Sequence, residues 1–204
     1  MNYFAHLALA QPTVASKVGN LIGDFMRGVR LEALPEPVRQ GLHNHRLVDR
    51  FTDHHPLVID SRRRFSDQRR RFAGVALDVL FDHFLIRHWS RFHERPLQEA
   101  IDENYRLLQR GAPLMPEAMR ATTRHMVEHD WFNRYAELEG IGRALDRIAA
   151  GLRFANRFQG MLEEIRDHHD ELEGVFLTLY PQLRQVVRAE ALETPPPEPA
   201  PKAD

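Results

Sequence analysis

The chain has 204 residues, of which 43% are hydrophobic and 28% charged, a profile that fits one globular domain with a buried core. It has no cysteine, which excludes disulfides and thiolate metal ligands, and its net charge of −1 does not favour a nucleic-acid or membrane partner. No apolar run approaches the roughly 18 to 20 residues of a membrane span, and the first residues do not resemble a signal peptide. We therefore expect a cytoplasmic protein that has neither a nucleic acid nor a membrane as its partner.

Each element that the sequence predicts is a helix, and proline and glycine mark many of the helix ends. The expected helices are Ser16 through Arg27, Glu36 to about Asp53, roughly Pro56 to Phe72, one from Gly74, one from Pro96, one through His125 and Trp131, and about Asn156 to Tyr180, ended by Pro181. Alternating runs rich in Val, Ile and Thr are missing, so a β-sheet has no source. The prediction is an all-α protein with a single compact helical domain.

The last twelve or so residues differ in composition from the rest of the chain. Residues 193–204 read ETPPPEPAPKAD, and this many prolines without a large apolar side chain cannot form a packed element. We therefore expect a helical domain over residues 1–192 and a disordered tail over residues 193–204.

The first candidate site residue, Asp24, lies in the apolar, glycine-flanked segment GNLIGDFMRG. Burying a carboxylate in such a setting is costly unless a positive group satisfies it, and a metal ion or Arg27 would do so. The alternative is a helix carboxylate that faces water.

The second segment, GLHNHRLVDRFTDHH, carries histidines and carboxylates at helical spacing. His45 and Asp49 are four residues apart and share one helix face, which Asp53 continues. A histidine one turn from a carboxylate can be a metal ligand beside it or a ligand that the carboxylate orients, and His43 is a further candidate. The alternative is a solvated, histidine-rich helix end.

The third segment, LDVLFDHFL, is strongly apolar but contains three ionisable residues. Asp78 and Asp82 share one helix face, whereas His83 lies about 100° further around the helix. Ionised groups among Phe and Leu need partners, and a divalent cation is one; a buried ion pair with an arginine is the alternative. Oxygen and imidazole ligands without thiolates suit Mg²⁺ or Mn²⁺, and also Fe or Zn.

Two further features carry weaker predictions. Residues 61–72 read SRRRFSDQRRRF, a local basic patch that would attract an acidic macromolecule, although a solvated helix face explains it equally well. His6, beside apolar Phe4 and Leu7, is either a core or supporting histidine, which we slightly favour, or an additional metal ligand.

At these same residues the sequence resembles the acyl carrier protein phosphodiesterases. The resemblance extends from about Met1 to Tyr180 and fails in the proline-rich end. It is carried by four ordered motifs: the opening MNYFAHL, then GNLIGDFMRG, GLHNHRLVDRFTDHHP and LDVLFDHFLIRHW.

The resemblance implies a helical, HD-like hydrolase that works with a divalent metal, most readily Mn²⁺, with Mg²⁺ or Fe²⁺ as alternatives. Its substrate would be holo acyl carrier protein, in which water activated by the metal cleaves the 4′-phosphopantetheine phosphodiester to leave apo acyl carrier protein. The alternatives are an HD-like phosphohydrolase acting on a nucleotide or another small phosphoester, and a binding module that holds acyl carrier protein without chemistry.

The resemblance also implies which positions act. We predict the catalytic residues to be Asp24, His45, Asp49 and Asp78, and the metal ligands to be Asp24, His43, Asp82 and His83. Ligand roles cannot be copied from ordinary HD enzymes, because the adjacent pair Asp82-His83 has the reverse of the usual His-Asp order. Since acyl carrier proteins are acidic, the predicted docking residues are Arg62, Arg63, Arg64, Arg69, Arg70 and Arg71.

Overall fold

The computed structural model describes residues 1–152 and 158–195, and within these ranges it contains helices and no strand. The α-helices are α1 (Tyr3–Leu9), α2 (Val14–Ile22), α3 (Glu36–His54), α4 (Pro56–Arg62), α5 (Ala73–Arg87), α6 (Trp89–Phe92), α7 (Leu97–Arg110), α8 (Glu117–Glu128), α9 (Trp131–Arg134), α10 (Leu138–Gly151), α11 (Met161–Asp167) and α12 (His169–Glu190). Short 3₁₀ turns are η1 (Gly23–Phe25), η2 (Leu31–Ala33), η3 (Arg70–Phe72) and η4 (Ala112–Leu114). The prediction of an all-α domain is confirmed.

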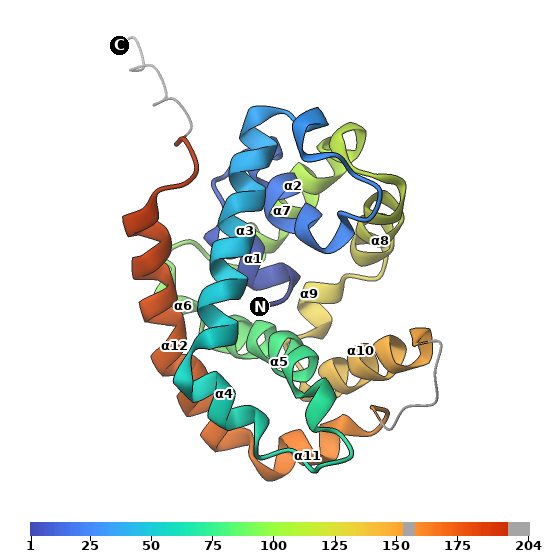
Figure 1. The fold of residues 1–204 in the computed structure, drawn as a ribbon, viewed down its shortest axis with the longest axis vertical. Helices are drawn as coiled ribbons and strands as arrows, with labels where there is room; N and C mark the ends of the chain where they lie inside the picture. The colour runs from blue at the N-terminus through green and yellow to red at the C-terminus, as the bar shows by residue number, and fades with distance from the viewer. Residues whose placement is uncertain (153–157, 196–204) are drawn as a thin grey trace.

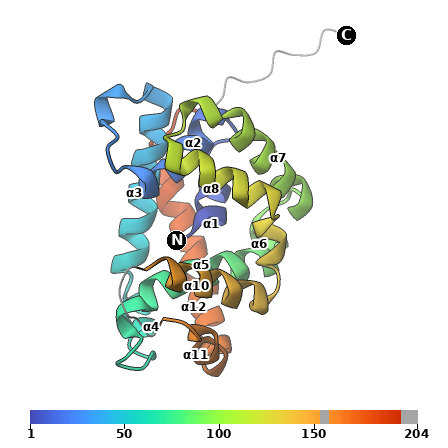
Figure 2. The same ribbon diagram turned by 90° about the vertical axis from the view of Figure 1, so that its right-hand side faces the viewer.

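Helix α5 lies at the centre of the molecule, and the other helices surround it (Figures 1 and 2). Most of its side chains are buried, including Phe81 and Phe84, which is why its sequence is apolar on nearly every face. It packs against α1, α10 and α12, and α12 also runs beside α3 and α4. The segment LDVLFDHFL therefore forms the core, and its ionisable residues must find partners within it.

Helices α2 and α3 form the tightest contact between elements, because glycines let their backbones meet. A Cβ atom at Gly19 would lie 2.8 Å from the Cα of Gly41 and 2.4 Å from the carbonyl oxygen of Val38. Only glycine allows this approach. It sets the end of α2 against the middle of α3, where the second and first sequence motifs meet.

Helix α1 has only seven residues, too few to be stable alone, and side chains from two other helices hold its ends. Asp82 of α5 accepts hydrogen bonds from the backbone N–H groups of Phe4 and Ala5, at 2.9 and 2.8 Å. The ammonium of Lys17 in α2 donates to the carbonyl oxygens of Leu7 and Ala10 at the other end. These four bonds satisfy backbone groups that a helix leaves open at its termini.

Several predicted helix bounds are confirmed and others are wrong. Helix α3 spans the expected residues, but the helix expected through Arg27 ends at Ile22 and gives way to η1, so Asp24 lies in a tighter turn. The helix expected over Pro56 to Phe72 ends at Arg62. After Arg62 the chain turns, and buried Phe65 holds this segment against the core outside a helix.

The long helix expected from Asn156 to Tyr180 is two helices, α11 and α12, and Asn156 lies outside the described residues. Pro181 does not end α12, which continues to Glu190. Proline removes one backbone donor, the one that would bond the carbonyl of Leu177, so the cost is limited to one turn. Burial of Leu183 on the far side of Pro181 stabilises the continuation.

The first residues of the expected tail touch the helical body. The carboxylate of Glu193 accepts a hydrogen bond from the Asn20 amide at 2.8 Å and another from the Ser16 hydroxyl, and the Thr194 N–H donates to Gln40. The rest of the expected tail, residues 196–204, lies outside the described residues. Among those described, no helix has both the length and the apolar character needed to cross a membrane.

Candidate active site

Two histidines and an aspartate converge where α1 meets α3. His6 Nε2 lies 3.1 Å from one carboxylate oxygen of Asp49, and His45 Nε2 lies 3.0 Å from the other. The two imidazole rings stack with their centroids 4.1 Å apart. One donor atom from each of the three residues lies within 4.8 Å of the other two. We call His6, His45 and Asp49 the central triad.

The backbone of α2 fixes the orientation of His45. Its Nδ1 lies 2.9 Å from the carbonyl oxygen of Asn20, so Nδ1 carries a proton and donates it, and Nε2 points at Asp49. Burial opposes the charged form, but the hydrogen bond and charge of Asp49 outweigh it and raise the pKa of His45. Nε2 is therefore the nitrogen of His45 available for chemistry.

Gly23 makes room for the His45 ring. A Cβ atom at this position would lie 2.1 Å from the ring carbon Cδ2 and from Nε2. Real side chains do not approach so closely, so the glycine in GNLIGDFMRG is required by the histidine of the next motif.

His6 occupies a different environment, although it faces the same carboxylate. Its side chain is fully buried, and burial lowers its pKa to about 4 against the attraction of Asp49. His6 Nδ1 has no hydrogen-bonding partner among the described residues. A neutral imidazole with an unshared nitrogen is the form in which histidine binds a metal ion.

Two further carboxylates border the central triad. Asp78 accepts a hydrogen bond from the Met1 ammonium at 2.8 Å, and that ammonium is 3.4 Å from Asp49. Burial opposes the charge of the ammonium, but Asp78 and Asp49 outweigh it and raise its pKa to about 10. Asp24, at the η1 turn, has an oxygen 4.0 Å from His45 Nε2.

The pKa values of Asp49 and Asp24 are shifted in opposite directions because their neighbours differ. Burial alone would raise the pKa of Asp49, but its bonds to His45 and His6 lower it well below the usual range. Although 46% of the Asp24 side chain is exposed, the protein around it excludes enough water to raise its pKa, against the attraction of His45. Asp49 is thus a permanent anion, whereas Asp24 is the carboxylate closer to exchanging a proton.

The donor set of this site fits a divalent cation. Two imidazole nitrogens and a carboxylate within 4.8 Å of one another match the ligands of Mn²⁺ and Fe²⁺ sites, and Asp24 and Asp78 add oxygen donors at the border. Nδ1 of buried His6 has no hydrogen-bonding partner among the described residues, and a bound ligand would supply one.

Of the seven predicted positions, the structure brings together four: Asp24, His45, Asp49 and Asp78. His43 is exposed, on a different face of α3 from buried His45. Both oxygens of Asp82 are used by the backbone of α1, and burial raises its pKa to about 7 against those two bonds. Nδ1 of His83 lies 2.8 Å from the carbonyl oxygen of Tyr135, away from the central triad.

Sequence reasoning gave too little weight to His6 and missed the Met1 ammonium and the Asn20 carbonyl. The residues around His6 are apolar, which is typical of a core position, and no spacing in the sequence links it to Asp49. A backbone carbonyl and a terminal amine carry no residue-type signal at all. Only the packing of α1 against α3 and α5 places these groups at the site.

The six arginines predicted to dock an acidic partner lie around the end of α4 and η3. Five of them form ion pairs within the chain: Arg62 with Asp53, Arg63 with Asp60, Arg64 with Glu171, Arg69 with Glu164 and Arg70 with Asp67. The guanidinium of Arg71 lies 4.4 Å from the centre of the Phe72 ring. A docking partner would therefore have to compete with carboxylates that are already in place.

A sequence model described as acyl carrier protein phosphodiesterase matches residues 1–183. The chain belongs to this family. Proteins named acyl carrier protein phosphodiesterase from Pectobacterium atrosepticum and Escherichia coli O6:H1 are 34% and 33% identical to it over 193 residues, 94% of this chain and 100% of theirs. One from Enterobacter sp. strain 638 is 33% identical over 90% of this chain and 95% of its own.

No solved structure matches the chain significantly. The family match includes α1 to α5, and so every residue of the central triad together with Asp24 and Asp78. It ends at residue 183, inside α12, so the last turns of that helix and Glu193 fall outside it.

Proposed function

We propose that this protein hydrolyses the phosphodiester that joins 4′-phosphopantetheine to acyl carrier protein, and that the central triad is its reaction centre. The proposal is supported by relatives that carry this activity in their name and match nearly the whole chain. The observation that carries it is the convergence of His6, His45 and Asp49 in that matched region. Water adds to phosphorus, the bond to the serine oxygen of the carrier breaks, and that oxygen leaves with a proton.

His6, His45 and Asp49 would hold a divalent cation, for which we propose Mn²⁺, with Mg²⁺ or Fe²⁺ as alternatives. Such a cation lowers the pKa of water and neutralises charge that develops on the phosphoryl oxygens. The chain's own contribution is to hold the three donors ready: Asn20 fixes the tautomer of His45, and α1 is held at both ends so that His6 stays in place.

Asp24 is the residue we assign to proton transfer. It borders the central triad, it is accessible to a substrate, and its raised pKa makes it the carboxylate there best able to accept a proton from the attacking water. Asp78 and Asp49 hold the Met1 ammonium, which adds a buried positive charge beside the place where the phosphodiester would lie.

A cavity of about 270 Å³ next to the site fits the pantetheine arm. Its lining includes Asn2 and Val79, the chain neighbours of Met1 and Asp78, and Tyr3. The other lining residues are Trp131, Tyr135, Ala144, Ile148, His125 and Arg147. Apolar walls with a few polar groups suit an arm that alternates methylenes and amides.

The test is to incubate the protein with holo acyl carrier protein and Mn²⁺ and to follow the mass of the carrier. We expect loss of the 4′-phosphopantetheine group by the wild type, and no loss after Asp49→Asn, which should bind less metal while folding normally. A panel of nucleotides and small phosphoesters serves as the comparison. Turnover of those compounds with an unchanged carrier would overturn the substrate, and an unchanged carrier with no turnover of any kind would overturn the activity.

A further inference from the structure

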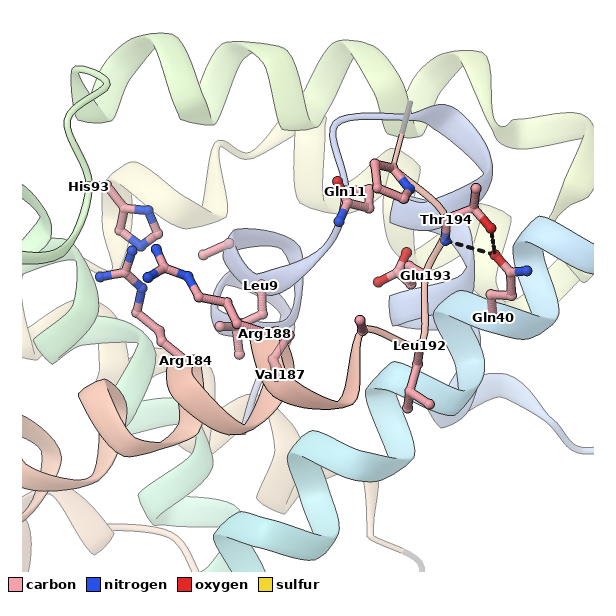
Figure 3. A pocket seen from close by; sticks show the side chains of 13 residues that line it. Leu9, Gln11, Gln40, His93, Arg184, Val187, Arg188, Leu192, Glu193 and Thr194 are labelled. Carbon is pink, nitrogen blue, oxygen red and sulfur yellow. Dashed lines mark hydrogen bonds between the residues drawn. The ribbon is translucent and has the colours of Figure 1, made fainter. Parts of the chain in front are cut away.

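A cavity of about 770 Å³ at the far end of α12 has no role in the proposed reaction. It lies between the end of α1, the side of α3 at Gln40, the last turns of α12 and the segment 191–195, and Figure 3 shows these walls. None of its lining residues belongs to the central triad or its border. Its size falls within the roughly 300 to 1,000 Å³ typical of small-molecule sites.

One end of this cavity is positively charged. Arg184 and Arg188 are four residues apart on α12, share one face of that helix, and lie beside His93, as Figure 3 shows. Neither arginine forms an ion pair within the described part of the chain, where the α12 carboxylates Glu171 and Glu173 pair with Arg64 and Arg87 instead. This differs from the arginine-rich stretch around α4, where carboxylates of the chain take up the charge.

The acidic residue of the cavity does not neutralise these arginines. Glu193 uses its carboxylate to accept hydrogen bonds from Asn20 and Ser16 of α2. Lys17, also in α2, does not line the cavity, and Glu103 and Glu193 attract its ammonium. Burial and the charges of Arg184, Lys17 and Arg188 lower the pKa of His93 at this end of the cavity. The positive end of the cavity therefore has an excess of charge that an anion would satisfy.

We propose that this cavity binds a small phosphomonoester. The guanidinium groups of Arg184 and Arg188 each offer a planar pair of donors, the geometry that matches phosphate oxygens, and two cations match its double negative charge. The body of the ligand lies along the apolar wall formed by Ala8, Leu9 and Val187. The proposal is independent of the activity at the central triad, since the two sites share no residue.

The experiment is isothermal titration calorimetry of the full chain with inorganic phosphate, with 4′-phosphopantetheine and with butyrate, in the presence of EDTA. EDTA removes cations that would recruit phosphate to the central triad. We expect saturable binding of phosphate, tighter binding of 4′-phosphopantetheine because its arm lies along the apolar wall, and much weaker binding of butyrate.

Three variants locate the binding. Arg188→Gln, at an exposed position, should weaken phosphate binding at least about tenfold, because a charge-assisted hydrogen bond is lost, and the double variant R184Q/R188Q should weaken it further. Arg110→Gln, an exposed arginine at the end of α7, should bind as the wild type does. Absence of saturable phosphate binding by the wild type, unchanged affinity in Arg188→Gln, or equal affinity for butyrate would overturn the proposal. A melting curve for each variant separates lost binding from lost folding.

Discussion

His6 and His45 present the same kind of side chain to Asp49 from two different environments. His45 has a second partner, the Asn20 carbonyl, and Asp49 raises its pKa, whereas His6 is buried with an unshared nitrogen and a pKa of about 4. At neutral pH the site therefore combines one fixed anion, one imidazole oriented by the backbone and one neutral imidazole. This asymmetry comes from local contacts, so single substitutions should reveal it.

Gly23→Ala is expected to disable the site while leaving the fold intact. The new methyl group would lie 2.1 Å from the His45 ring, which must move, and a displacement of about 1 Å at a reacting group costs roughly 100-fold in rate. The measurement is kcat/KM on holo acyl carrier protein with Mn²⁺, together with the melting temperature. Gly174→Ala is the matched control, because a Cβ there meets nothing within 4 Å and should leave the activity unchanged. Wild-type activity in Gly23→Ala would remove His45 from the mechanism.

At the scale of elements, short helix α1 depends on side chains of α2 and α5. Asp82 closes its N-terminal end and Lys17 its C-terminal end, and between them α1 carries His6. Burial lowers the pKa of Lys17 to about 8, against the attraction of Glu103 and Glu193. Keeping this ammonium charged at the end of α1 therefore costs free energy. Asp82 of the LDVLFDHFL segment and Lys17 of α2 thus position the element that completes the central triad.

Asp82→Asn should destabilise the fold whether or not metal is present. An amide replaces one carboxylate oxygen with a donor, which leaves the N–H of Phe4 or of Ala5 buried without an acceptor, at about 1 to 3 kcal/mol. Unfolding by urea, followed with and without EDTA, measures the loss. If Asp82 acted only as a metal ligand, as its position in the motif first suggested, the loss would vanish in EDTA. Asp78→Asn serves as the comparison, since Asp78 bonds the Met1 ammonium rather than the backbone of α1.

On the scale of the whole molecule, residues from distant parts of the sequence meet at the site and around it. The central triad comes from α1 and α3, the cavity beside it is walled by α8, α9 and α10, and Glu193 reaches back to α2. Asn20 connects these regions, because its amide bonds Glu193 and its carbonyl bonds His45. Stability of the whole fold and integrity of the site are therefore coupled.

His93 is expected to make the folded state sensitive to mild acid. Burial and the charges of Arg184, Lys17 and Arg188 lower its pKa from 6.5 to about 4. Between these values the unfolded chain binds more protons than the folded one, so this contribution to stability is complete above pH 6.5 and is lost as the pH falls towards 4. His93→Phe, which keeps a ring against Trp89, should reduce the slope of unfolding free energy against pH in that range.

The control for this prediction is Tyr180→Phe, which removes the hydroxyl 3.0 Å from His93 Nε2 and keeps the imidazole. The slope should persist in this variant, since burial and the neighbouring cations cause the shift. Identical slopes for the wild type and His93→Phe, measured by urea unfolding at several pH values, would contradict the assignment. His6 has a similarly lowered pKa, so part of the acid sensitivity should remain in His93→Phe.

The residues of α3 illustrate what could be predicted and where prediction stopped. The i, i+4 spacing of His45 and Asp49 placed both on one face, because helical geometry is local, and the structure confirms their contact at 3.0 Å. His43 and His83 looked equally suitable by composition, but one is exposed and the other bonds Tyr135. Which histidines meet depends on how helices cross, and spacing within one helix carries no information about that.

The sequence by itself determined the all-α class, the extent of α3 and the motifs of the family. It also indicated four of the residues that gather at the site. These features could be predicted because periodicity, proline breaks and i, i+4 pairs act over a few residues. Only the tertiary structure decided that His6 joins Asp49, that Asp82 closes α1, and that α12 continues through Pro181. Each of these depends on a partner dozens of residues away, brought near by the burial of apolar side chains around α5. Residue types thus predicted a cluster of histidines and carboxylates, whereas packing decided which of them meet.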